Sequence, residues 1–269
     1  MRLLLHIGTE KTGTKSLQTW FAQNREPLRQ QGVHYPTSLG DRVHRSLALF
    51  AMDPNQPDER FVQEGIQSAV DHQAFCERTF NSFTRECDAF AAIPTWILSC
   101  EQLHSRLATQ EMVERVKSFL CDRFESIKVI VHLRPQVDLA VSLASTGARG
   151  GTRINAAWFA PDPEQEYYFN YNLSVGWWEN VFGENAVTIV PFKRKPNLVK
   201  MLIDELSIED SSMTPVERKN EALDWRSIAL SNALALYNPS RDFNEVFIDD
   251  WPFRERLEIG LELAQRFQS

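Results

Sequence analysis

The sequence has little cysteine and no long apolar run. It contains four cysteines in 269 residues, and no two are spaced as C-x-x-C: Cys76, Cys87, Cys100 and Cys121. Zinc-knuckle and thioredoxin-like motifs depend on that spacing, so we expect free thiols in a reducing compartment and no metal site. No apolar stretch approaches the about 20 residues that cross a bilayer, so no transmembrane segment is expected. The sequence also shows no internal repeat and no low-complexity tract.

Positive charge is also scarce, because 29 Lys and Arg stand against 36 Asp and Glu, which gives a net charge of −7. Nucleic-acid-binding proteins are more often basic, so we expect no nucleic-acid partner. A small anionic ligand is still compatible with this total, since local donors decide whether it binds. The first expected strand begins at Arg2 without a charged leader and a cleavable apolar segment, so a cytoplasmic location is expected.

Short apolar runs alternate with helical patterns along the chain. Strands are predicted at 2–7, 33–36, 94–100, 127–134 and 186–192. Helical spacing is expected over 14–31, 58–92, 109–125, from about 137, and over 172–182, and the remainder is mainly helical. This alternation is typical of α/β proteins, so we expect a P-loop-like three-layer fold with a central parallel sheet flanked by helices. At this length a single domain over residues 1–269 is the expectation.

The segment HIGTEKTGTKSL, residues 6–17, joins the first expected strand to the first expected helix. A glycine-bearing turn before a helix presents free N–H groups and the positive end of the helix dipole, and both favour a phosphate. Gly8 and Gly13 permit close approach of the backbone to a ligand, and Lys11 or Lys15 adds positive charge. We therefore expect an anion site, with a plain strand–helix connection as the alternative.

The loop fits the nucleotide-triphosphatase motif G-x-x-x-x-G-K-[ST] imperfectly, because Thr14 intervenes between Gly13 and Lys15. P-loop enzymes also usually place an Asp after a second apolar strand to hold magnesium. Here the expected strands end in LSCE and HLRP, so Glu101 is the available substitute. A small-molecule kinase that uses Mg-ATP is therefore an alternative function, weakened at two points. A catalytically inactive nucleotide-binding protein is a further alternative.

The same loop resembles the 5′-phosphosulfate loop of sulfotransferases that use 3′-phosphoadenosine 5′-phosphosulfate (PAPS). The family pattern is close to K-[ST]-G-[ST]-[ST]. In this sequence the corresponding residues are Lys11, Thr12, Gly13, Thr14 and Lys15. Lys15 departs from the pattern, since a hydroxyl residue is usual there, and Ser16 follows it. The resemblance implies that this loop binds the 5′-phosphosulfate and that Lys11 stabilises the leaving bridging oxygen.

A second segment resembles the 3′-phosphate signature of the same family, an Arg after a strand and a Ser eight residues later. VIVHLRPQVDLAVSLAS supplies Arg134 and Ser142 at that separation, in an R-x-Q form similar to bacterial members. A guanidinium presents a planar fork to a phosphate, and the Ser hydroxyl lies about two helical turns on. A surface Arg and a helix-packing Ser are the alternative. Fainter likeness extends over 177–197 and 220–238.

The resemblance implies in-line transfer of a sulfuryl group to a hydroxyl or amine of a carbohydrate, glycolipid or small metabolite, and the acceptor then needs a base. Family members use Glu or His. Glu101 is the first candidate because it ends a strand at the edge where open α/β sheets bind ligands. A Glu that only favours a helix dipole is the alternative. His104, one turn further on, is a candidate helper or an ordinary surface histidine, and His44 is a second candidate. His6 and His132 lie in strands and are expected in the core.

The segment 146–171 contains glycine, aromatic residues and charges of both signs. It is a candidate lid over the acceptor, with a stacking platform from Trp158, Tyr167 or Tyr168 and with anion contacts from Arg149 and Arg153. The alternative is that the aromatic residues pack on the sheet edge and the arginines are solvated.

Overall fold

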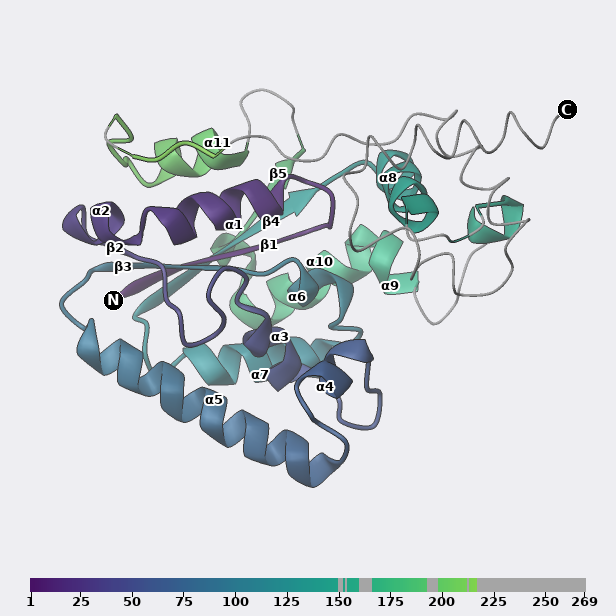
Figure 1. The fold of residues 1–269 in the computed structure, drawn as a ribbon, viewed down its shortest axis with the longest axis horizontal. Helices are drawn as coiled ribbons and strands as arrows, with labels where there is room; N and C mark the ends of the chain where they lie inside the picture. Colours follow the sequence, from purple (N-terminus) through teal and green to yellow (C-terminus); the bar gives the residue numbers. More distant parts are fainter. Residues whose placement is uncertain (150–151, 153, 160–165, 193–197, 212, 217–269) are drawn as a thin grey trace, which may run out of the picture. The chain divides into compact units, whose positions relative to one another are not determined.

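The computed structural model describes residues 1–149, 152, 154–159, 166–192, 198–211 and 213–216 (Figure 1). The chain divides into two compact units. The first comprises Met1–Pro135 and Pro163–Arg218, and the second comprises Gln136–Asp162 and Lys219–Ser269. That the whole chain acts as one domain stays a prediction. The resemblance noted over 220–238 lies outside the residues that the structure describes.

The described part of the first unit is built around a parallel sheet of five strands in the order β2-β3-β1-β4-β5. The strands are β1 (Arg2–Gly8), β2 (Val33–His34), β3 (Thr95–Ser99), β4 (Ser126–Leu133) and β5 (Val187–Pro191). All the predicted strands are present. The second is shorter than predicted because Pro36 has no N–H with which to continue the ladder. Since the strands are parallel, their carboxyl ends meet at one edge.

Helices cover both faces of this sheet (Figure 1). One face carries α1 (Thr14–Gln23), α2 (Arg25–Gln30) and α11 (Leu198–Glu205). The other carries α3 (Arg45–Ala51), α5 (Ala69–Ala89), α7 (Gln110–Leu120) and α10 (Tyr171–Phe182). The short elements of this unit are α4 (Glu59–Gln63), α6 (Gln102–Ser105), α9 (Glu166–Phe169) and the 3-10 helix η3 (Glu184–Ala186). The second unit contains α8 (Gln136–Arg149) and the 3-10 helix η1 (Ala156–Phe159).

Two apolar cores fill the space between the sheet and its helix layers. In β1, Leu3, Leu5 and Ile7 belong to the core on the α5 side, whereas Leu4 belongs to the core under α1. This alternation follows from the period of two along a strand. The three-layer α/β fold predicted from the sequence is therefore confirmed.

The helix predicted over 14–31 is two helices, because the side chain of Asn24 interrupts it. Asn24 is buried, and its Nδ2 donates to the carbonyl oxygens of Trp20 (2.9 Å) and Thr214 (3.0 Å). Its Oδ1 accepts a hydrogen bond from the N–H of Thr214 (2.8 Å). The break therefore depends on a partner 190 residues away, which the local pattern does not contain.

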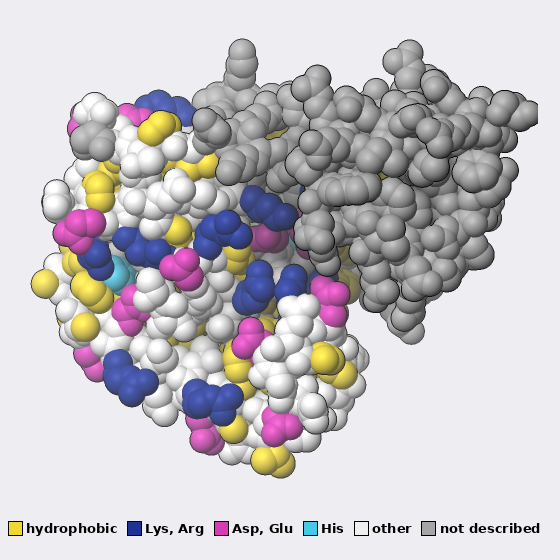
Figure 2. Space-filling model, viewed as in Figure 1, with side chains coloured by type: hydrophobic (Ala, Val, Ile, Leu, Met, Phe, Trp, Pro, Cys, Tyr) yellow, Lys and Arg dark blue, Asp and Glu magenta, His cyan; other side chains and the backbone are white. Residues whose placement is uncertain are grey.

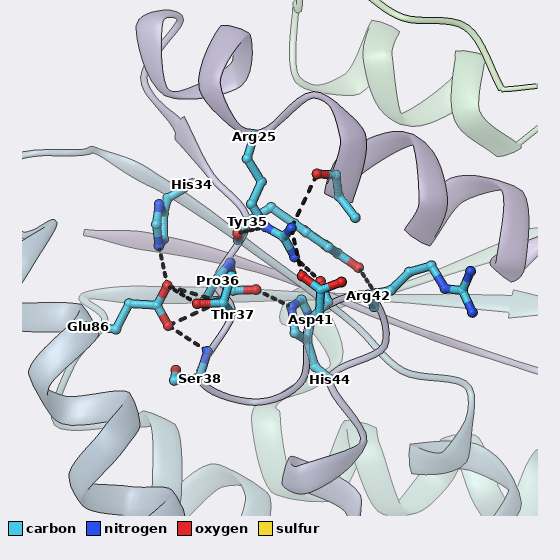
Figure 3. A network of polar contacts seen from close by, with 11 residues as sticks. Arg25, His34, Tyr35, Pro36, Thr37, Ser38, Asp41, Arg42, His44 and Glu86 are labelled. Atoms are coloured by element: carbon cyan, nitrogen blue, oxygen red, sulfur yellow. Dashed lines mark hydrogen bonds and ion pairs between the residues drawn. The ribbon is translucent and has the colours of Figure 1, made fainter.

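A partly buried carboxylate, that of Glu86, connects α5 to the segment after β2 (Figure 3). Glu86 accepts hydrogen bonds from His34 Nε2 (3.1 Å) and from the N–H groups of Thr37 (3.0 Å) and Ser38 (2.8 Å). Burial alone would raise the pKa of Glu86, but these hydrogen bonds outweigh burial and lower the pKa to about 2. Glu86 is therefore ionised in the folded protein at neutral pH.

Among the described helices, none is both long enough and apolar enough to cross a membrane. All four cysteines are free thiols, as predicted.

We expect Glu86→Gln to lower the free energy of unfolding by about 1–3 kcal/mol at pH 7, because a neutral amide replaces an ionised acceptor. The folded-state pKa lies below the ordinary value of 4.5, so the stabilisation is complete above pH 4.5 and is lost as the pH falls towards 2. Chemical denaturation of parent and variant across this range measures the difference. Glu77→Gln, on an exposed position of the same helix, is the matched control. A difference that does not change with pH contradicts the prediction.

Candidate active site at the carboxyl ends of the strands

The loop between β1 and α1 contains two residues with a positive φ, one of which is not glycine. Lys11 has a φ of 65° and Gly13 a φ of 92°, both in the left-handed region. A non-glycine residue is strained there, so its surroundings must hold it. Arg134, which follows β4, does this, because its Nη1 donates a hydrogen bond to the carbonyl oxygen of Lys11 (2.7 Å). Two predicted phosphate-binding residues are thereby brought together.

The first turn of α1 is open to an anion. Gly13 is the N-cap residue and provides no side-chain cap. Its carbonyl accepts hydrogen bonds from the N–H groups of Ser16 (3.1 Å) and Leu17 (3.3 Å). The N–H groups before them have no acceptor within the helix and carry the positive end of its dipole. Lys15 is exposed on this turn, which adds a positive charge.

The hydroxyl and glycine positions of the loop differ in what they do. Thr12 is buried, and its hydroxyl donates to the carbonyl oxygen of Thr9 (2.9 Å), so its hydrogen is used within the loop. Thr14 is buried as well, whereas Ser16 is half-buried. A Cβ on Gly8 would lie 2.9 Å from the Cβ and the carbonyl oxygen of His132. Gly8 therefore serves the close approach of β1 and β4, which corrects the expectation that it lies against a ligand.

Arg134 is held in place through its backbone as well as its guanidinium. Its N–H donates to Thr9 Oγ1 (3.1 Å), and its carbonyl oxygen accepts a hydrogen bond from Tyr171 Oη (2.6 Å). The guanidinium carbon lies 5.1 Å from the ring centre of Phe192, a cation–π contact. Ser142, its predicted partner, lies on α8 in the second unit, where its carbonyl accepts a hydrogen bond from Thr146 Oγ1. The pairing of Arg134 with Ser142 stays a prediction.

A hydrogen bond connects Glu101 to α1, the helix that follows the loop. It directly follows Cys100 at the end of β3, and its Oε2 accepts a hydrogen bond from Gln18 Nε2 (2.6 Å). The same Nε2 lies 3.4 Å from Ser99 Oγ, which in turn is 2.9 Å from His6 Nδ1. Gln18 is fully buried on α1, one turn after Thr14. Gln18 was not predicted as a site residue. Its position beside Leu17, on the apolar face of a helix, could have indicated a buried polar contact.

His104 is a buried titratable residue in α6, just after the carboxyl end of β3. It is 3% exposed, and neither ring nitrogen has a hydrogen-bond partner within the part of the chain that the structure describes. Its ring lies against Tyr168 and Tyr171, with centroid distances of 5.2 Å and 6.0 Å. Burial lowers the pKa of His104 to about 4, so the imidazole is neutral at pH 7.

The tyrosines of α9 pack against the site. Tyr168 is buried, and its hydroxyl donates to Glu10 Oε2 in the β1–α1 loop (3.0 Å). Tyr167 donates to the carbonyl oxygen of Ser105 (3.0 Å). A stacking platform from Tyr168 is therefore wrong, and the alternative of packing at the sheet edge holds. Of the segment's other candidates, Trp158 and Arg149 belong to the second unit, and Arg153 lies outside the described residues.

His44 does not fit the role of a base. It is fully buried, its Nδ1 accepts a hydrogen bond from the N–H of Ser99 (2.9 Å), and its Nε2 donates to the carbonyl oxygen of Pro36 (3.0 Å). Burial lowers the pKa of His44 to about 4. Both nitrogens are thus committed to the backbone, and the expectation for His44 is wrong. The expected core position of His6 is confirmed, since it is fully buried against Ser99.

Two cavities of the first unit lie at opposite edges of the sheet. A cavity of about 300 Å³ is lined at the amino ends of the strands by Arg2, Thr95 and Ser126 among others. A smaller cavity of about 170 Å³ is lined by Leu133, Tyr171 and Ile189 near the carboxyl end of β4. Open parallel sheets bind ligands at the carboxyl ends of their strands, so the larger cavity is not the candidate. No cluster of three or more metal-ligating side chains is present in the described ranges.

We expect the His104 ring to stay neutral down to about pH 5, because burial opposes the charged form. Side-chain NMR from pH 8 to 4 measures this, and His104→Phe assigns the resonance by its loss. A midpoint near the ordinary value of 6.5 contradicts the burial of the ring.

No family model matches the chain, and a search of curated proteins gives no match. Among solved structures, a sulfotransferase from Alicyclobacillus acidocaldarius is similar to this chain, with a TM-score of 0.45 and 16% sequence identity. The similarity covers 87% of this chain and 92% of that one. We therefore argue the function from the chain's own residues.

Proposed function

We propose that the protein is a cytoplasmic sulfotransferase of the bacterial type that transfers a sulfuryl group from PAPS to a hydroxyl or amine. The proposed acceptor is a carbohydrate, a glycolipid or a small metabolite. The observation that carries the proposal is the hydrogen bond from Arg134 Nη1 to the carbonyl oxygen of Lys11. It joins two segments, 123 residues apart, that each resemble one phosphate-binding signature of PAPS-dependent enzymes.

The donors present suit a nucleotide with phosphate groups at both ends. The start of α1, which has no side-chain cap, offers N–H groups. Lys11 offers an ammonium group, and Arg134 offers a planar guanidinium. We assign the 5′-phosphosulfate to the loop, with Lys11, Thr12, Gly13, Thr14, Lys15 and Ser16. We assign the 3′-phosphate to Arg134 and Ser142.

When bound, PAPS supplies the sulfuryl group, and the electron pair of the broken S–O bond stays on the oxygen of the 5′-phosphate. In this proposal, Lys11 and the N–H groups at the start of α1 stabilise that growing charge. Glu101 accepts the proton of the attacking hydroxyl through Oε1, because Oε2 already accepts a hydrogen bond from Gln18. Glu101 then releases the proton to solvent. His104, neutral and without a partner among the described residues, is proposed to assist in holding the acceptor.

Nucleotide binding separates this proposal from a kinase. Calorimetry is expected to show binding of adenosine 3′,5′-bisphosphate without added metal. Lys11→Ala and Arg134→Gln are each expected to weaken it roughly tenfold or more, since each removes a charged phosphate contact. Arg85→Gln, on an exposed position of α5, is the control and leaves the affinity unchanged. Binding of Mg-ATP alone overturns the proposal.

The base is tested by Glu101→Gln, which keeps the hydrogen bond from Gln18 possible but cannot accept a proton. With radiolabelled PAPS and a panel of acceptors, we expect turnover to fall by roughly 10²–10⁴-fold while bisphosphate affinity is retained. Gln18→Met is expected to lower kcat more than it changes KM, because Gln18 only positions the carboxylate. Parent-like turnover in Glu101→Gln removes Glu101 from the role of base.

A further inference from the structure

Beside Glu101, a tight turn presents two arginines at the end of β3. The turn begins at Gly40, whose φ is 129°. A Cβ at this position would lie 2.2 Å from the carbonyl oxygen of Val43, so the turn requires glycine. The same carbonyl accepts a hydrogen bond from the N–H of Arg45 (2.8 Å), and Ser46 N–H donates to the carbonyl of Leu39 (3.2 Å). Arg45, the first residue of α3, is therefore held in place by the turn.

The turn is attached to the strand that carries the candidate base. The N–H of His44 donates to the carbonyl oxygen of Ser99 (3.2 Å), and His44 Nδ1 accepts from the N–H of Ser99 (2.9 Å). Arg45 is the next residue after His44, and Glu101 is the second residue after Ser99. The arginine of the turn and the carboxylate that follows the strand are thus connected through one backbone and one side-chain hydrogen bond between His44 and Ser99.

Acidic side chains in the described ranges do not neutralise these arginines. Asp41, the neighbour of Arg42, forms its ion pair with Arg25 (3.1 Å). Other arginines, Arg29, Arg60, Arg106 and Arg123, have carboxylate partners, whereas no described carboxylate forms an ion pair with Arg42 or Arg45. Figure 3 shows the Arg42 side chain extending away from Asp41 and Glu86. Lys and Arg side chains gather on the face drawn in Figure 2, near α1 and between α1 and α3 as labelled in Figure 1.

Arg42 and Arg45 lie on either side of Val43 and His44, in the segment that is hydrogen-bonded to the end of β3. Burial is the main cause that raises the pKa of Tyr35, and the charges of Arg42 and Glu101 both act on the same hydroxyl. Tyr35 also donates a hydrogen bond to the carbonyl oxygen of Arg42 (2.7 Å). Arg45 acts in the same way on the thiol of Cys100, the residue before Glu101. Both arginines thus belong to a segment that is hydrogen-bonded to Tyr35 and to Ser99 at the end of β3.

We propose that the acceptor of the sulfuryl group is itself an anion, and that Arg42 and Arg45 bind a sulfate or carboxylate on it beside the attacking hydroxyl. This inference rests on the proposed function. The donor carries several negative charges, so a second anion at the site is repelled unless cations offset that repulsion. The nucleotide is assigned to the side of β1 and β4, through Lys11 and Arg134. Arg42 and Arg45 lie on the side of β3, where the acceptor must approach Glu101.

The test compares matched sugars: methyl β-D-glucuronide and glucose 6-sulfate as anionic probes, and methyl β-D-glucoside as the neutral one. Calorimetry or ligand-detected NMR is performed with the full chain, with and without adenosine 3′,5′-bisphosphate. We expect the anionic probes to bind roughly tenfold more tightly than the neutral one. The double variant Arg42→Gln/Arg45→Gln is expected to abolish this preference, and Arg85→Gln to retain it.

Three results overturn the inference. One is equal binding of the anionic and neutral probes to the parent protein. Another is a preference that survives in the double variant. The third is a double variant that loses bisphosphate affinity instead, which would assign the arginines to the nucleotide. Failure of the parent to bind the bisphosphate at all counts against the proposed function, whereas the probe preference measured without nucleotide still decides the arginine site.

Discussion

The hydrogen bond between the Arg134 guanidinium and the carbonyl of Lys11 is the contact on which the candidate site depends. Lys11 is strained in the left-handed region, and such strain persists only where the surroundings hold it. The central position of β1 makes this possible, because β4 lies directly beside it and ends at the same level, with Gly8 opposite His132. The fold thus fixes the loop through a neighbour that is distant in sequence.

The end of β3 is a second centre of organisation. Ser99 contacts Gln18 and His6 through its hydroxyl and His44 through its backbone. Elements from both faces of the sheet therefore meet at the residue two positions before Glu101. The helix that follows β1, α1, packs on one face of the sheet, whereas α7, which follows β3, packs with α10 on the other.

The sequence predicted what depends on local pattern. The five strands and the start of α1 after a glycine-bearing loop could be predicted because apolar runs, glycines and a helix start lie within a few residues of one another. The features that were not predicted depend on hydrogen bonds to residues that are distant in sequence. Gln18 meets a carboxylate 83 residues away, Tyr168 one 158 residues away, and Asn24 ends α1 through Thr214. His44 was a plausible base by position in a loop, and only its burial and its two backbone partners show otherwise.

The loop that we propose to bind an anion also contains an acid, Glu10, and a hydrogen bond from α9 occupies its carboxylate. Tyr168 donates its hydroxyl to that carboxylate, so the negative charge is occupied by α9. The ring of the same Tyr168 lies against His104, so α9 contacts both the acid of this loop and the buried histidine that follows β3.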